Sequence, residues 1–148
     1  MGQQQLLLVI LVTIIVGIAT VVAINTFSSA SDSANLDAVR QDMLSIASSA
    51  QQYYMKPEAL GGGGNDFEGI TVNNLGGVPG DISGSYIVNE NGSYSISPVA
   101  SNDSLQITGY PSSDPAYSEA STSGGSIVGV AGADEYNITQ PYTEGSTN

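Results

Sequence analysis

The sequence predicts an α+β protein in which one long N-terminal α-helix packs on a small antiparallel β-meander. Two observations lead to this fold class. A helical pattern runs from residue 3 to residue 54, and short alternations of apolar and polar residues, separated by Gly, Pro and Asn, follow it. The 148 residues suffice for one modest domain. We expect residues 1–56 to form the helix, and residues 57–148 to form a small globular β domain with a loop-rich C-terminal tail.

The first part of the predicted helix is apolar on every side. No ionisable side chain precedes Asp32, and only Thr13, Gly17 and Thr20 interrupt the apolar residues from Leu6 to Ile24. As a helix this stretch is about 28 Å long, which is roughly the thickness of a bilayer's hydrocarbon layer. A helix without a polar face must be surrounded by lipid or by other protein. Because the rest of the chain is too small and too polar to enclose residues 3–25, we expect lipid or copies of the same chain to do so.

Three interpretations of this segment are open. A removable signal sequence normally begins with positive residues, and residues 1–5 have none, although residues 28–30 (Ser-Ser-Ala) resemble a cleavage site. The second interpretation is an ordinary transmembrane anchor with a single span. The third is a helix that begins in the membrane and ends in the packed core of a filament. The residues that follow favour the third interpretation over the second.

Residues 36–55 form the amphipathic part of the predicted helix. Apolar side chains recur at spacings of three and four, so they lie on one face of the helix. Lys56 and Pro57 predict its end. This face is the expected cover for the sheet, and its residues are Leu36, Val39, Met43, Ile46, Ala47, Ala50 and Tyr54.

The β domain is predicted from short alternating segments. A type I′ turn at Asn91-Gly92 predicts a hairpin between residues 85–90 and 93–97. Further strands are expected at residues 70–75, 104–110, 126–130 and 136–142, with a loop at 111–126 and a tail at 144–148. The residues expected on the apolar face of this sheet are Tyr86, Val88, Tyr94, Ile96, Leu105 and Ile107.

Composition excludes several classes of function. The chain has no His and no Cys, which removes imidazole bases, thiolate nucleophiles and zinc-thiolate sites. With 14 acidic residues against two basic ones, nucleic acid is not an expected partner. Asp66 and Glu68, in the glycine-rich residues 61–69, are weak candidates for a cation site, but a flexible connection is the favoured interpretation. We expect no enzyme activity, no cofactor and no dedicated metal site.

The order of these segments resembles the type IV pilins and pseudopilins. The opening residues Gly2-Gln3-Gln4-Gln5-Leu6-Leu7-Leu8 are similar to the prepilin pattern of a Gly, a few polar residues and an apolar run. The resemblance implies a pilin-like fold and a structural subunit of an extracellular filament at the cell surface, used for adhesion, motility or biofilm contact. The implied partners are other copies of the chain in a helical homo-oligomer, the inner membrane before assembly, and a pilus assembly machinery. The alternative is a membrane-anchored extracytoplasmic module, or a minor pseudopilin of a secretion system, that forms no long filament.

The chain departs from the family pattern in two ways. Pilin precursors are expected to have a basic leader that is cut after Gly, whereas only Met1 precedes Gly2 here, so Gly2 and Gln3 are candidate processing residues. Most bacterial pilins also have an early glutamate that pairs with a neighbour's N-terminus. The matching position is Leu6 or Leu7, which makes this ion pair unavailable.

Assembly in water would bury the apolar side chains of residues 6–24 between copies of the chain. Gln3, Gln4 and Gln5 are then expected to hydrogen-bond between subunits, because buried amides need partners. Gly17 is the weak point of the helix and permits close approach of a neighbour. Asn91, Asn102 and Asn137 match the N-glycosylation sequence. The predicted assembly core consists of Leu6, Leu7, Leu8, Val9, Ile10, Leu11, Val12, Ile14, Ile15, Val16, Ile18, Val21, Val22 and Ile24.

Overall fold

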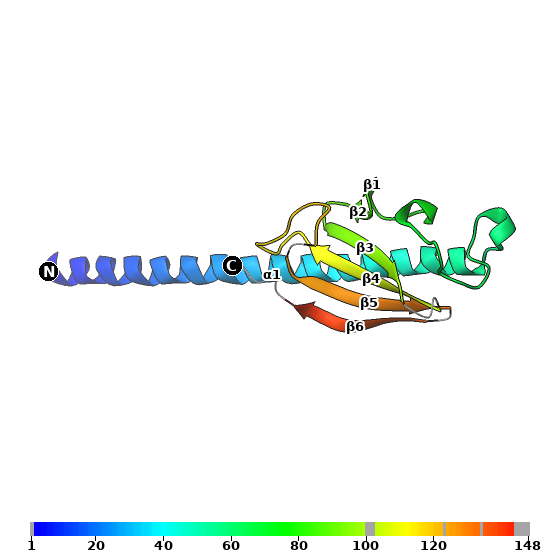
Figure 1. Cartoon of the computed structure of the whole chain (residues 1–148). Helices are drawn as coiled ribbons and strands as arrows, with labels where there is room; N and C mark the ends of the chain where they lie inside the picture. The colour runs from blue at the N-terminus through cyan, green and yellow to red at the C-terminus, as the bar shows by residue number, and fades with distance from the viewer. Residues whose placement is uncertain (1, 100–102, 123, 134, 144–148) are drawn as a thin grey trace. The chain divides into compact units, whose positions relative to one another are not determined.

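The computed structural model describes residues 2–99, 103–122, 124–133 and 135–143. It contains one long helix, α1 (Gly2–Met55), followed by a six-stranded antiparallel sheet, which confirms the predicted fold class (Figure 1). The chain divides into two compact units between residues 34 and 35. The helical pattern in the sequence, residues 3–54, lies one residue inside the observed bounds at each end, and the expected helix, residues 1–56, exceeds them by one residue at each end.

The end of α1 is capped by the glycine run, residues 61–64. The backbone N–H groups of Gly63, Gly64 and Asn65 donate to the carbonyls of Tyr53, Lys56 and Tyr54, each over 2.9 Å. Glycine is required for this close approach, since a Cβ on the second glycine of the run would lie 2.2 Å from the Lys56 carbonyl oxygen. The residues predicted to be a flexible connection therefore satisfy the last carbonyls of the helix.

The six strands are hydrogen-bonded in sequence order, each antiparallel to the next. The four strands predicted at residues 85–90, 93–97, 104–110 and 126–130, and the one at 136–142, are all observed, with small shifts at their ends. The strand at 81–83 was not predicted. The bounds are β1 (Asp81–Ser83), β2 (Tyr86–Val88), β3 (Gly92–Pro98), β4 (Ser104–Pro111), β5 (Ser126–Gly132) and β6 (Tyr136–Thr143).

The prediction of a strand at residues 70–75 is wrong. This segment contains a 3₁₀-helix, η2 (Val72–Asn74), preceded along the chain by η1 (Glu58–Leu60). The Asn74 side-chain oxygen accepts hydrogen bonds from the Thr71 N–H (2.9 Å) and the Thr71 hydroxyl (2.5 Å). This local capping competes with strand pairing, as Asn and Thr side chains commonly do. Ile70, Val72 and Leu75 are nevertheless buried.

The predicted β2–β3 hairpin is present, but its turn and its inward face differ from the prediction. Neither Asn91 nor Gly92 has a positive φ, so the turn is not type I′. Asn89 organises it instead: its N–H donates to the Gly92 carbonyl over 2.9 Å, and its side-chain oxygen accepts the N–H groups of Asn91 and Gly92. On β2 the buried side chain is Ile87, whereas the predicted Tyr86 and Val88 are half-buried on either side of it.

The hydrophobic core lies between one face of the sheet and the amphipathic part of α1. Val39, Met43, Ile46, Ala47 and Ala50 are buried, which confirms the predicted stripe, while its end members at 36 and 54 are partly buried. Gly109 on β4 allows the close contact, because a Cβ there would lie 2.8 Å from both Met43 Sδ and Val39 Cγ1. The sheet contributes Ile87, Tyr94, Leu105, Ile107, Ile127 and Ala131 to this core.

A carboxylate on α1 fixes the β2–β3 hairpin to the helix. Asp42 Oδ2 accepts hydrogen bonds from the side-chain amides of Asn89 and Asn91, both over 2.8 Å, and from the Tyr94 hydroxyl over 2.7 Å. Burial, together with the Asp42 carboxylate, raises the pKa of Tyr94 well above its usual value, so Tyr94 stays protonated and donates. Tyr94 is fully buried, which makes this network part of the core.

The connection between β4 and β5 was predicted to be a loop, and a second buried carboxylate organises it. Asp114 is 6% exposed. Its side chain accepts the N–H groups of Ala116 (2.7 Å) and Gly125 (3.0 Å) and the hydroxyl of Tyr142 on β6. Asp114 therefore joins both ends of this connection to the last strand.

Candidate assembly surface

The apolar segment of α1 is exposed along its whole length in the single subunit. The exposed fraction of its large side chains ranges from 47% for Ile10 to 67% for Leu7. None of the apolar stretch is buried within the structure, and by length and composition the helix can cross a membrane. An exposed apolar surface of this extent is expected only where lipid or another protein covers it. All fourteen predicted assembly-core residues lie on this surface.

The hydroxyl groups of this segment are satisfied within the helix. Thr13 donates to the carbonyl of Val9 and Thr20 to that of Val16, both over 2.8 Å. Thr26 makes the same bond to Val22 over 2.9 Å. These side chains therefore need no water and no partner, so the helix can enter lipid or a dry protein interior without an unpaired hydroxyl. These bonds were not predicted, although the hydroxyl of a Thr within a helix can donate to the carbonyl four residues before it.

Gly17 and the three glutamines are open to contacts from outside the subunit. A Cβ placed on Gly17 meets no atom within 4 Å, so nothing inside the subunit requires a glycine there. Gln3, Gln4 and Gln5 are exposed at the start of α1. Their role in registration, and processing at Gly2 or Gln3, depend on groups outside a single subunit and stay predictions.

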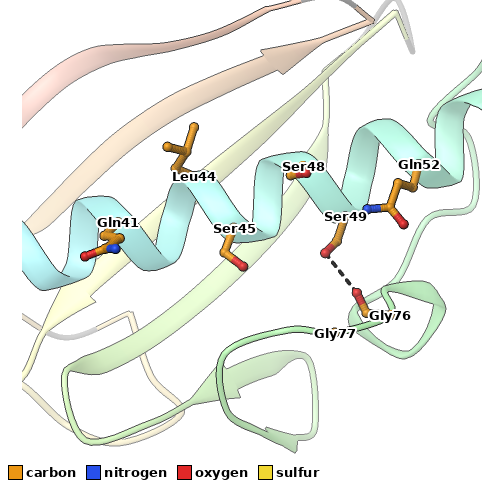
Figure 2. Close-up of a pocket in the computed structure, with 8 residues that line it drawn as sticks. All are labelled: Gln41, Leu44, Ser45, Ser48, Ser49, Gln52, Gly76 and Gly77. Atoms are coloured by element: carbon orange, nitrogen blue, oxygen red, sulfur yellow. Dashed lines mark hydrogen bonds between the residues drawn. The ribbon is translucent and has the colours of Figure 1, made fainter.

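A second exposed surface lies on the side of α1 that the sheet does not cover. We call it the α1 groove. Ser49 donates a hydrogen bond to the Gly76 carbonyl over 2.9 Å, which holds the segment after η2 against the helix (Figure 2). Leu44 is 56% exposed beside small and polar neighbours, and none of the lining residues is charged. The groove, which the sequence analysis missed, is lined by Gln41, Leu44, Ser45, Ser48, Ser49, Gln52, Gly76 and Gly77.

The weak cation candidates, Asp66 and Glu68, do not form a chelating cluster. Asp66 Oδ1 accepts the Glu68 N–H over 2.6 Å, a turn that Asp side chains commonly make. Across residues 2–99, 103–122, 124–133 and 135–143 no three His, Cys, Asp or Glu side chains gather in a way that could hold a metal ion.

The three glycosylation sequences lie in different environments. Asn91 is half-buried, and its side-chain nitrogen donates to Asp42, so a glycan there would compete with the hairpin network. Asn137 is exposed on β6. Asn102 lies outside the described residues.

Comparisons of this chain with protein-family models, curated proteins and solved structures find no match. The fold itself, a long N-terminal helix with an apolar first half and an antiparallel sheet packed on its second half, is compatible with a pilin-like fold. The apolar half is compatible with membrane embedding.

Proposed function

We propose that this chain is the structural subunit of a pilus-like extracellular filament, which assembles from the membrane through the apolar segment of α1. The observation that carries the proposal is that none of residues 6–24 is buried, in a chain whose second unit already has its own core. The sheet has no free apolar face with which to cover this segment, because α1 residues 36–54 occupy it. The cover must therefore come from outside the subunit.

The size of the exposed apolar surface supports a polymer outside the membrane. Burying a Leu, Ile or Val side chain contributes about 1.5–3 kcal/mol, and the fourteen assembly-core side chains are still about half exposed, so covering them contributes roughly 10–20 kcal/mol per subunit. In lipid the same side chains gain little by contacting each other, since acyl chains are equally apolar. Such a subunit would stay separate in the membrane, where contact gains little, and would polymerise on leaving it, where burial of these side chains is strongly favourable.

Gly17 provides the test. Gly17→Leu keeps the segment apolar, and a Cβ at this position meets no atom within 4 Å apart from the adjacent helix backbone. The variant should therefore enter the membrane and fold as the unmodified chain does. In a packed filament core, the added side chain would separate neighbouring helices. The matched control is Val16→Leu, which changes the size of an adjacent apolar side chain only slightly.

The measurement compares filaments sheared from cells and pelleted without detergent with subunits extracted from membranes. We expect the unmodified chain and Val16→Leu in the sheared pellet, and at least a five-fold loss from the pellet for Gly17→Leu with the membrane pool unchanged. If the unmodified chain is found only in detergent-extracted membranes, the chain is an anchored module and the proposal is wrong.

A further inference from the structure

The strands that form the body of the sheet carry no charged residue. None of the residues in β2, β3, β4, β5 and β6 is Asp, Glu, Lys or Arg, although the chain has a net charge of −12. After α1, the acidic residues of the described chain lie in η1, in β1 or in the connections, for example Glu58, Asp81 and Glu90. Solvent-facing strand positions of a strongly acidic protein are an ordinary place for charge, so its exclusion from five consecutive strands is informative.

The charge-free residues form one continuous surface, which we call the outer sheet face. It is the face opposite α1, because neighbouring residues such as Leu105 and Ile107 point into the core. The strand register aligns two rows across β3, β4, β5 and β6. All eight side chains are half-buried or exposed. The first row is Ser95, Thr108, Val128 and Gln140, and the second is Ser97, Gln106, Val130 and Asn137.

The outer edge of the same sheet also lacks charge. β6 is eight residues long and, within the part of the chain that the structure describes, pairs with β5 alone. Exposed edges are usually protected by charged side chains, short strands or proline, and only Pro141 is present here. The edge therefore lacks the charge that would keep another copy away from the outer sheet face.

We propose that the outer sheet face is a contact surface between copies of this chain, through which adjacent filaments associate side by side. Two copies, each with a charge of −12, repel where their acidic surfaces meet, so close approach costs the least electrostatic energy through a surface without carboxylates. The outer sheet face is such a surface. The inference rests on the proposed function, because side-by-side association requires that the chain forms filaments.

Gln106→Glu tests this inference in the full-length protein. It places one carboxylate at an exposed position in the centre of the outer sheet face. The matched control is Asn73→Asp, which makes the same amide-to-carboxylate change at an exposed position in η2. Low-speed centrifugation collects bundles, and high-speed centrifugation collects all filaments, including single ones. Both are measured in low salt and in 1 M NaCl, and electron microscopy counts filaments per bundle.

We expect all three proteins to give the same high-speed pellet. In low salt, the low-speed pellet of Gln106→Glu should fall at least three-fold below those of the unmodified chain and Asn73→Asp, and salt should restore it by screening the added charge. Single filaments of the unmodified chain, or equal bundling of Gln106→Glu and Asn73→Asp, would overturn the inference while leaving the proposed function intact. The absence of any high-speed pellet would overturn both.

Discussion

Replacing Asp42 by alanine should loosen the β2–β3 hairpin from α1. The carboxylate is the common acceptor for two amides and for the hydroxyl of the fully buried Tyr94. After truncation, Asn89 keeps its second bond, to the Pro79 carbonyl over 2.6 Å, and Tyr94 keeps only a long contact of 3.4 Å with Asn89. No other acceptor for the Asn91 amide is seen among the described residues, so truncation leaves two donors poorly paired.

The expected magnitude follows from these losses. A hydrogen bond to a charged group contributes about 1.5–3 kcal/mol, and a buried donor that loses its acceptor costs a similar amount. Because the three bonds share one oxygen, their contributions are not additive. We expect Asp42→Ala to lower the free energy of unfolding by about 3 kcal/mol, and Asp42→Asn, which retains an acceptor, by about 1–2 kcal/mol.

Urea unfolding of the full-length chain in detergent micelles, followed by tyrosine fluorescence, measures this difference. Asp37→Ala is the control, because Asp37 lies on the same helix but is exposed and pairs only with Arg40, over 2.6 Å, among the described residues. Surface ion pairs contribute little, so we expect a change within about 0.5 kcal/mol for the control. Equal, small effects of Asp42→Ala and Asp37→Ala would refute the role assigned to Asp42.

Two further substitutions test the packing. Gly109→Ala should lower the free energy of unfolding by about 1–3 kcal/mol, because its Cβ would lie 2.8 Å from Met43 and Val39, whereas Gly76→Ala, with open space around it, should be near neutral in the same urea titration. Tyr136→Phe should raise that free energy by up to about 1 kcal/mol at pH 7, since the buried hydroxyl has no hydrogen-bond partner among the described residues. Burial also raises the pKa of Tyr136 to about 12, above the unfolded value near 10, so the unfolded state ionises first and stability falls as pH rises from about 10 to 12. Tyr136→Phe should show a smaller fall over that range than the unmodified chain, and an equal fall in both would contradict this assignment.

Patterns in the sequence predicted the elements that depend on local periodicity. The spacing of three and four from Leu36 to Tyr54 identified the buried face of α1 correctly, because a helix repeats every 3.6 residues whatever it packs against. The strand positions at 104–110 and 126–130 followed from alternation in the same way. The prediction of the inward-facing residues of β2 was wrong because all three of its residues, Tyr86, Ile87 and Val88, are apolar. The sequence therefore does not show which of them points inward.

Of the candidate surfaces, only the one formed by a continuous segment could be predicted from the sequence. The apolar segment could be found from the sequence because its nineteen uncharged residues are consecutive, so no contact with a distant residue has to be known. The α1 groove and the outer sheet face depend on residues far apart in the chain, such as Ser49 with Gly76, or Gln106 with Val130. No local pattern relates such pairs.

The sequence alone determined that this chain has a charge-free helix long enough to cross a membrane, because that property depends only on the order of residues along one segment. The tertiary structure decided the role of the acidic and glycine residues: Asp42 and Asp114 became internal acceptors, and residues 61–64 became the cap of α1. It also decided that the five charge-free strands share one surface. The physical reason is that a polar group's role depends on the partner it meets, and long-range packing chooses that partner.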